Sequence, residues 1–314
     1  MLYFLINLDI LNIKLIKLMR IYDCITYFDE DILLNFRLNC LNKYVDKFVI
    51  VECKYNHRGI KKGFNLNFKK IKDFKDKVIY IKVNERPTNL NIIKKTDNEK
   101  TVNSKHILNG YIWDHFQRNK IIEGLRDCNP NDIIMISDLD EIPNLKNINF
   151  KKINKRLIFF RQKILFYKFN LLYKNRFWFG TRACKKKNLI SPQWIRDVKH
   201  KKYSRFRFDI LFSKNKYSDI FYVKNGGWHY TNLKSAKDIF KKFRNYAHYL
   251  EFKLSKLKLK DIKKMILEKR AIYNHEVDQR ENKFNGNIKL CKFNKKYWPD
   301  YLKINYHKYK KWVA

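Results

Sequence analysis

The sequence predicts an α/β protein whose core is a doubly wound, mixed β-sheet. In the first half of the chain, short apolar strand segments alternate with helical segments, a pattern typical of parallel sheets with helices on both faces. In the second half, short aromatic strand segments follow one another without long helices, which indicates an antiparallel or mixed extension of the sheet. With 45% hydrophobic and 16% aromatic residues among 314, the chain can bury a large core and is not disordered.

The elements of the first half each have a local signal. Asp29 is placed to cap a helix whose apolar residues recur at helical spacing between Leu33 and Tyr44. A second helix is expected around residues 113–126. The segment 87–109 is polar and rich in Asn and Lys, which predicts a surface loop or a mobile lid. The expected strands are 21–26, 47–52, 78–83 and the apolar run that ends at Asp138.

The second half is predicted in the same way. Ser235 and Asp238 form a capping-box pattern, and the helix that they begin carries its apolar residues from Ala236 to Leu250 on one face. The aromatic tail 297–312 is expected to pack back onto the body of the protein. The expected strands are 157–160, 164–169, 177–183, 205–212 and 220–223.

The chain is expected to form one domain over residues 19–314, because it contains no internal repeat and no linker. Residues 1–18 are interpreted as a dispensable N-terminal extension. Their apolar run is interrupted by Asp9, Lys14 and Lys17, so it is too short to span a bilayer. The lysines also follow the apolar run, whereas a signal peptide carries them before it. An interfacial amphipathic segment is the alternative.

The cysteines indicate a cellular setting. Six are present, far apart in the sequence and without a Cys-x-x-Cys pair, so neither a disulfide framework nor a zinc site is expected. Such usage is typical of a reducing cytosol. We therefore expect a cytoplasmic protein, with peripheral contact to a membrane as a further expectation.

The net charge of +40 has two interpretations. It favours polyanionic partners, namely nucleic acid, anionic lipid head groups or diphosphate substrates. However, the basic residues are spread along the chain, together with frequent Asn and Ile, as an A/T-rich genome encodes at tolerant surface positions. Dedicated nucleic-acid binders gather their basic residues in one arm or stripe. No specific nucleic-acid partner is therefore expected.

The strongest chemical signal is the sequence Asp138-Leu139-Asp140-Glu141-Ile142-Pro143 at the end of a buried strand. Ligands bind at this edge of open α/β sheets. Asp138 and Asp140 are two residues apart, so on an extended backbone both side chains point the same way. Their oxygen atoms favour Mg²⁺ or Mn²⁺ and leave coordination positions for phosphate oxygens. The alternative is a polar turn with a helix cap. We predict a metal–diphosphate site.

Other residues are placed to join this site. His229 follows the glycine pair Gly226-Gly227 and is a candidate third metal ligand, or else a hydrogen-bonded structural histidine. Arg118 and Lys120 lie on the helix before the Asp138 strand, where a cation could meet phosphate or simply face solvent. Glu52 ends a strand at the same sheet edge, where it could contact a nucleoside or cap a turn.

In combination, these segments resemble glycosyltransferase family 17, whose best-known member is the β-1,4-mannosyl-glycoprotein β-1,4-N-acetylglucosaminyltransferase. The resemblance covers about residues 20–312, in order and at plausible spacing. The matching segments are 22–24, 33–38, 45–52, 118–119 with 124–125, 132–134 with 138–143, 227–231, the Lys-rich helix to His248, and 297–302.

The resemblance implies a GT-A-like fold, with a Rossmann-like nucleotide-binding half and an antiparallel or mixed acceptor half. It implies a UDP-sugar donor, UDP-N-acetylglucosamine in known members, inversion at the anomeric carbon, and Mn²⁺ or Mg²⁺ bound by Asp138 and Asp140. Asp23, Glu52, Arg118 and Lys120 are then candidate contacts to the nucleotide-sugar. The chain lacks the long anchor and stem of the animal enzymes, so the acceptor is expected to be a polysaccharide, a lipid-linked glycan or a glycoprotein.

The catalytic base is not identified by sequence. Asp197, Asp209 and Glu251 follow the metal-binding strand and are the candidates. Trp178, Trp194 and Trp228 are candidates for stacking on the acceptor sugar or for core packing.

Two alternatives to a transferase remain. One is a basic nucleic-acid-binding protein without catalysis. The other is a phosphatase of the haloacid dehalogenase type, whose Asp-x-Asp pattern is superficially similar but normally belongs to the first strand of the fold.

Overall fold

The fold is that of a computed structural model, which describes residues 19–201, 203, 208–210, 212–245, 249–275, 283–284 and 286–314. The expected extension 1–18 lies outside the described residues. Within them, none of the helices is long and apolar enough to cross a bilayer.

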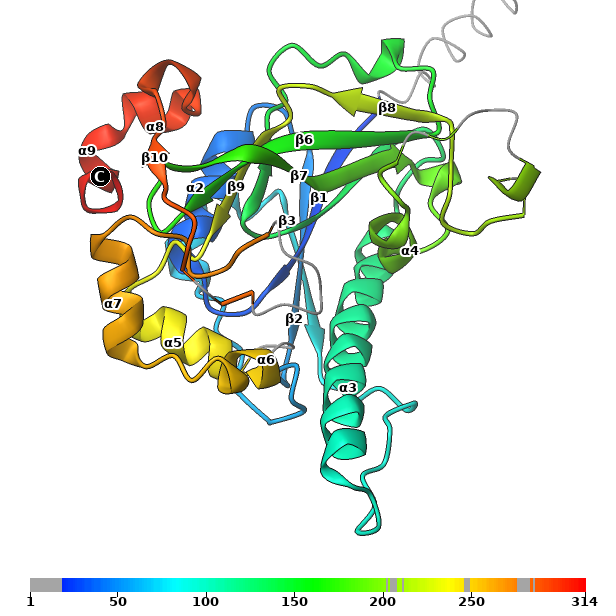
Figure 1. Ribbon diagram of the computed structural model, residues 1–314. Helices are drawn as coiled ribbons and strands as arrows, with labels where there is room; N and C mark the ends of the chain where they lie inside the picture. The colour runs from blue at the N-terminus through cyan, green and yellow to red at the C-terminus, as the bar shows by residue number, and fades with distance from the viewer. Residues whose placement is uncertain are drawn as a thin grey trace, which may run out of the picture.

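One mixed sheet organises the described part of the chain. Its ten strands follow the order β3-β2-β1-β4-β7-β6-β9-β5, with β10 paired to β7 and β8 paired to β6. The strands are β1 (Ile21–Tyr27), β2 (Lys47–Cys53), β3 (Val78–Val83), β4 (Ile133–Asp138), β5 (Glu141–Pro143), β6 (Leu157–Phe166), β7 (Leu171–Lys185), β8 (Ile220–Val223), β9 (Gly227–Thr231) and β10 (Cys291–Lys292). The first four are parallel to one another, and β7 joins β4 in antiparallel orientation. Figure 1 shows the sheet curling, so that β6 and β7 cross the direction of β1 and β2.

The inner parallel strands β1, β2 and β4 are mostly apolar because both of their faces are covered. Alternate residues of one strand therefore enter different cores. Ile50 packs with α2 (Asp31–Leu41) on one face, whereas its neighbours Val49 and Val51 pack with Trp113 of α3 (Glu99–Asn119) on the other. Figure 1 shows α2 and α3 on opposite sides of β1 and β2. The doubly wound arrangement predicted from sequence is confirmed for this half.

Helices α5 (Ala236–Asn245) and α7 (Leu259–Leu267) cover β6 in the second half of the sheet. They pack Ile164 and Phe166 of β6 into a third hydrophobic cluster, together with Ile239 and Ile262. The other helices are α4 (Pro192–Asp197), α6 (Tyr249–Leu254), α8 (Asp300–Ile304) and α9 (Tyr306–Tyr309), with short 3₁₀ helices such as η2 (Lys120–Leu125) and η5 (Phe208–Ile210).

Several elements differ from their predicted bounds. The strands expected at 157–160 and 164–169 are one strand, β6, with register shifts against β7. The strand expected at 205–212 is wrong in its described part, where residues 208–210 form η5. The helix expected to run to Leu250 ends at Asn245 in α5, and residues 246–248 lie outside the described residues.

Other local signals act as expected. The Ser235 hydroxyl accepts the Asp238 backbone N–H at 3.2 Å, which is the capping contact that the pattern predicts. The aromatic tail packs back, since Trp298, Leu302 and Tyr309 are buried in the core that α2 covers. By contrast, the prediction of a loop over 87–109 is wrong from Glu99 onward, because α3 begins there and Asn98 caps it.

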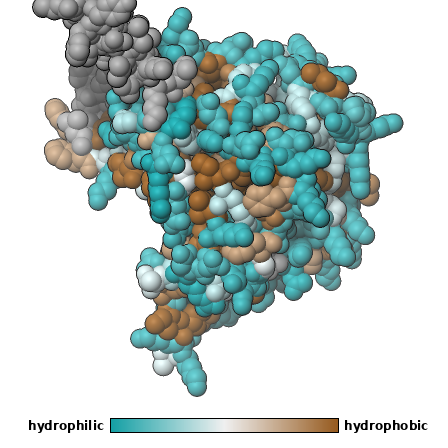
Figure 2. All heavy atoms as spheres, turned by 180° about the vertical axis from the view of Figure 1, so that it is seen from behind, coloured by the Kyte–Doolittle hydropathy of each residue, from teal (hydrophilic) through white to brown (hydrophobic). Residues whose placement is uncertain are grey.

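Figure 2 shows hydrophilic side chains across the face seen from behind, with smaller hydrophobic groups between them. The view agrees with basic residues that are distributed along the chain.

Candidate active site

A cavity of about 650 Å³ opens at the carboxyl ends of β1 and β4. Its walls come from both halves of the protein: the end of β1 and the residues after it, the middle of α3, the turn after β4, β7, β9, α5, residues 273–275 and Lys283. Parallel strands that end together leave backbone groups and polar side chains at one edge of the sheet, where a ligand can enter. This cavity is therefore the candidate active site.

The turn from Asp138 to Glu141 forms the floor of the site. Strand β4 ends at Asp138, and β5 begins at Glu141 after a two-residue turn. The premise that Asp138 and Asp140 share one extended strand is therefore wrong. Both residues nevertheless line the cavity, because the turn presents them on the same side.

Asp138 is held between two arginines. Its Oδ1 accepts Arg118 Nη2 at 3.0 Å, and its Oδ2 accepts Arg196 Nη2 at 3.0 Å. Burial alone raises the pKa of a carboxyl group, but Arg196 and Arg118 outweigh it and hold the pKa of Asp138 well below its usual range. Asp138 is therefore a carboxylate whose two oxygens are each bound to a cation.

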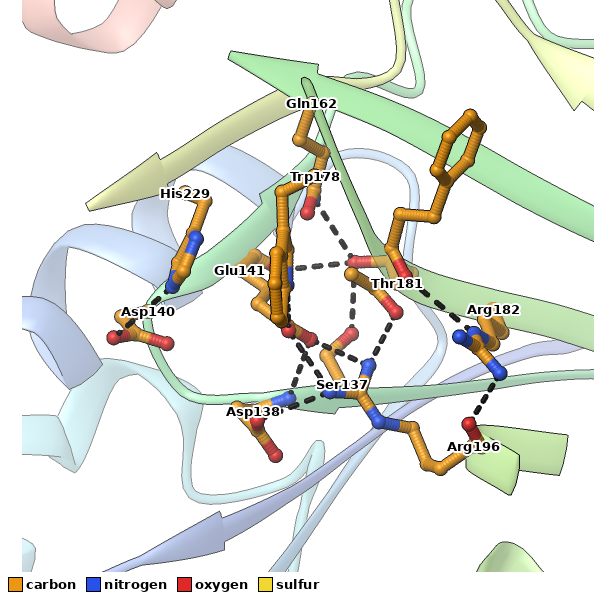
Figure 3. A network of polar contacts seen from close by, with 12 residues as sticks. Ser137, Asp138, Asp140, Glu141, Gln162, Trp178, Thr181, Arg182, Arg196 and His229 are labelled. Carbon is orange, nitrogen blue, oxygen red and sulfur yellow. Dashed lines mark hydrogen bonds and ion pairs between the residues drawn. The ribbon is translucent and has the colours of Figure 1, made fainter. Parts of the chain in front are cut away.

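Glu141 anchors the same turn from below. Its buried carboxylate accepts Trp178 Nε1 at 2.6 Å, the Asp138 backbone N–H at 2.8 Å, and both amino groups of Arg196 at 2.7 and 2.9 Å. Figure 3 shows these contacts converging beneath the turn. A fully buried carboxylate with this many donors is a structural anchor rather than a reactive group.

His229 faces Asp140 from the neighbouring strand. Strand β9 pairs with β5 so that His229 lies opposite Glu141, and His229 Nε2 is 3.6 Å from Asp140 Oδ2. Burial lowers the pKa of His229, but Asp140 outweighs this effect and raises it overall. The reciprocal effect of His229 lowers the pKa of Asp140 against its own burial.

The glycine pair before His229 allows this close pairing. A Cβ atom at Gly226 would lie 2.4 Å from Arg161 N, and one at Gly227 would lie 2.2 Å from Ile142 O. Gly227 also has φ of +119°. The two glycines thus let β9 approach the backbones of β5 and β6, rather than the backbone approach a ligand.

The side chains of Asp140 and His229 could together hold a metal cation. Asp140 and His229 face each other across the cavity edge, and the His229 Nδ1 has no hydrogen-bond partner in the described structure. No group of three His, Cys, Asp or Glu side chains is arranged around one point among the described residues. The geometry therefore favours Asp140 and His229 as ligands, with the remaining positions left for ligand oxygens and water.

Two predicted nucleotide contacts lie away from the cavity. Asp23 is fully buried, and both of its oxygens accept Arg37, at 2.6 and 2.7 Å. Glu52 is also fully buried and accepts Lys62 Nζ at 2.7 Å and Tyr80 Oη at 2.8 Å. The structure places both carboxylates in internal networks.

Of the two predicted cations, only Arg118 lines the cavity. It binds Asp114 as well as Asp138, with Nη1 at 2.8 Å from Asp114 Oδ2. Lys120 lies outside the cavity and pairs with Glu123 at 2.8 Å and with Glu85 at 3.7 Å.

The three base candidates are scattered. Asp209 pairs with Lys216 at 2.9 Å, and Asp197 accepts Gln193 Nε2 at 2.8 Å, both away from the cavity walls. Glu251 of α6 does not line the cavity either, but its charge adds to burial in raising the pKa of the cavity residues Tyr111 and Tyr273.

The three candidate tryptophans have different surroundings, and only one of them lines the cavity. Trp178 lines the cavity and stacks on His229 with ring centroids 5.2 Å apart. Trp194 and Trp228 instead donate to backbone carbonyls, those of Lys214 and Tyr297.

Sequence reasoning missed two groups at the site. Asp114 is four residues before Arg118 on α3, a spacing that indicates a helical ion pair and could have been found. Arg196 has no local signal, because only the tertiary fold brings α4 beside the turn after β4.

The fold is that of an α/β protein with a cavity, lined in part by charged residues, at the carboxyl edge of a mixed sheet. Residues 10–310 match the model of glycosyltransferase family 17, and the chain belongs to this family. It is therefore a glycosyltransferase, and this membership decides against the two alternative classes. The match begins within the segment 1–18. No curated protein matches the chain.

Proposed function

We propose that this protein is a metal-dependent, inverting glycosyltransferase with a GT-A-like fold, which transfers N-acetylglucosamine from UDP to a hydroxyl group of a glycan. The observation that supports the proposal best is the Asp140–His229 pair at the edge of the cavity, beside the carboxyl end of β4. A Mn²⁺ or Mg²⁺ ion bound there would offset the charge that develops on the departing diphosphate.

The residues around this pair have separate tasks in the proposal. Asp140 and His229 hold the cation. Arg118 and Arg196 fix Asp138, so that the turn keeps one shape before and after the donor binds. The nucleoside would occupy the wall formed by Thr26, Tyr27 and α3, which adjoins the turn at the carboxyl end of β1.

Glu251 is the base that we retain among the three sequence candidates. It is the one whose charge acts on cavity-lining tyrosines, Tyr111 and Tyr273. From α6 it would take the proton of the acceptor hydroxyl as the new glycosidic bond forms on the face opposite the departing UDP.

Donor hydrolysis tests the proposal directly. The full chain is incubated with UDP- and GDP-sugars and Mn²⁺, with and without a chelator, and nucleotide release is measured. We expect release from UDP-N-acetylglucosamine that the chelator abolishes. Asp140→Asn should lose it, while Asp209→Asn, a distant carboxylate, keeps it. Metal-independent release, or preference for a GDP-sugar, would contradict the corresponding part of the proposal.

A further inference from the structure

The charges of the described residues that line the cavity do not balance. Each acidic residue among them already has a partner: Glu30 pairs with Lys234 at 3.2 Å, Asp114 and Asp138 pair with Arg118, and Asp140 faces His229. Three further cations line the same cavity without an ion pair to any described residue, namely Arg176 of β7, Lys242 of α5, and Lys283.

These three cations lie at different parts of the cavity. Lys242 is at the Asp140 end, since its charge lowers the pKa of Asp140. Lys283 Nζ lies 5.9 Å from the centre of the Tyr273 ring. Burial is the main cause of the pKa shifts of Tyr273 and His275, and the charges of Arg176 and Lys283 lower both pKa values. Trp178 contacts a residue of each end, because its ring centroid is 5.2 Å from that of His229 and 5.9 Å from that of His275.

A nucleotide-sugar donor does not account for Arg176 and Lys283, the two cations at the end of the cavity away from Asp140. A sugar diphosphate carries about two negative charges, which a divalent cation at Asp140 and His229 offsets, with Lys242 beside it. Glu251, whose charge adds to burial in raising the pKa of Tyr273, supplies one negative charge at this end. Among the described residues, Arg176 and Lys283 together still leave this end positive. A site that holds unbalanced cations beside aromatic rings is suited to an anionic sugar.

We propose that the acceptor is an anionic glycan, whose carboxylate or phosphate group binds Arg176 and Lys283 while its sugar ring lies near Trp178 and Tyr273. This inference rests on the proposed function, because it treats the Asp140 end as the donor side.

Binding of small charged and neutral glycosides tests it. The probes are p-nitrophenyl β-glucoside, p-nitrophenyl β-glucuronide and p-nitrophenyl β-glucoside 6-phosphate, titrated into the full chain with and without UDP and Mn²⁺. We expect the anionic probes to bind about tenfold more tightly than the neutral one. The difference between the glucuronide and the phosphate shows which anion the site prefers.

Matched variants assign the effect to these residues. The double variant Arg176→Gln with Lys283→Gln should lose the preference for anionic probes and keep its affinity for UDP. Lys242→Gln should weaken UDP binding and keep the preference. Lys260→Gln with Lys263→Gln removes two exposed charges outside the cavity and should change neither.

Equal binding of neutral and anionic probes by the unaltered protein would overturn the inference. So would loss of UDP binding, rather than of the anion preference, in the Arg176 and Lys283 variant, since these cations would then serve the donor. An equal loss in the Lys260 and Lys263 control would show a general effect of basic charge and would also overturn it. Absence of nucleotide-sugar hydrolysis, with the anion preference intact, would instead count against the proposed function.

Discussion

Arg196 binds Glu141 through both guanidinium amino groups, with Nη1 2.7 Å from Oε2 and Nη2 2.9 Å from Oε1. The same Nη2 also reaches Asp138 Oδ2 at 3.0 Å. One side chain from α4 therefore clamps both ends of the turn that carries Asp140 (Figure 3). The planar guanidinium group suits this task because its donors point in fixed directions.

Replacement of Arg196 should cost both stability and turnover. Arg196→Ala leaves the buried Glu141 without its main cation, so we expect the free energy of unfolding to fall by about 3–5 kcal/mol. Arg196→Lys keeps the charge but loses the pair of guanidinium amino groups that bind Glu141. It should lower kcat more than it raises the KM of the donor. Urea unfolding and steady-state kinetics measure the two effects. Arg126→Lys, at an exposed position, is the control, and equal effects there would refute the clamp.

The two aspartates should differ in their effect on metal binding. Asp140→Asn and His229→Ala each remove a candidate ligand, so the Kd for Mn²⁺ should rise about tenfold or more. Asp138→Asn leaves the Asp140–His229 pair in place and should change this Kd much less, although it disturbs Arg118 and Arg196. Electron paramagnetic resonance of free Mn²⁺ in the presence of UDP gives the Kd without an activity assay. A larger loss in Asp138→Asn would show that Asp138 is the principal ligand.

His275 should make the protein less stable in acid. Burial lowers the pKa of His275 to about 3, from 6.5 in the unfolded chain. Between these values the unfolded state binds a proton that the folded state does not, so stability falls as the pH drops below 6.5. The slope contributed is at most about 1.4 kcal/mol per pH unit. The Tm of His275→Phe should therefore fall less than the Tm of the unaltered protein when the pH is lowered from about 7 to about 5. His307→Phe, at an exposed site, should follow the unaltered protein, and identical slopes in all three would disprove the effect.

The Asp23–Arg37 pair should be essential for folding. Both side chains are fully buried, and Arg37 also donates to the Glu141 backbone carbonyl at 2.8 Å. Asp23→Ala leaves a buried guanidinium group without its carboxylate, so we expect a loss of about 3–5 kcal/mol in the free energy of unfolding. The exposed pair of Lys146 and Asp300 offers a comparison, and Asp300→Ala should cost less than about 1 kcal/mol. Similar losses in the two variants would contradict this assignment.

The parallel half of the sheet could be predicted closely from sequence. The bounds expected for β3, 78–83, are those of the structure, although β3 is the half-buried edge strand of the sheet, because β-branched and aromatic residues follow one another along it. The expected strand at 205–212 is wrong in its described part, where residues 208–210 form η5, although polar and apolar residues alternate from Arg205 to Ile210. A period of two over so short a segment therefore does not by itself fix a strand. Strand β6 was predicted as two separate strands, because its apolar pattern is interrupted where its register against β7 shifts.

The site was only partly predictable. The motif around Asp138 and the glycine pair before His229 lead to the same cavity, since both signals are local. Glu52 was predicted at the sheet edge from its strand position, and Asp23 was a candidate through the family resemblance. Neither signal says whether a carboxylate meets a ligand or an internal partner such as Arg37. The role of Arg196 depends on the packing of α4, which no local pattern encodes.

The short turn between β4 and β5 has a consequence for how this chain can evolve. Strand β4 is hydrogen-bonded inside the parallel half, while β5 pairs with β9 at the far end of the sheet. The two residues between them therefore bridge fixed partners. An insertion or deletion there would shift Glu141 out of line with His229 and turn alternate side chains to the wrong face. Neighbouring surface loops tolerate changes in length, whereas this one is expected to tolerate only changes in side chain.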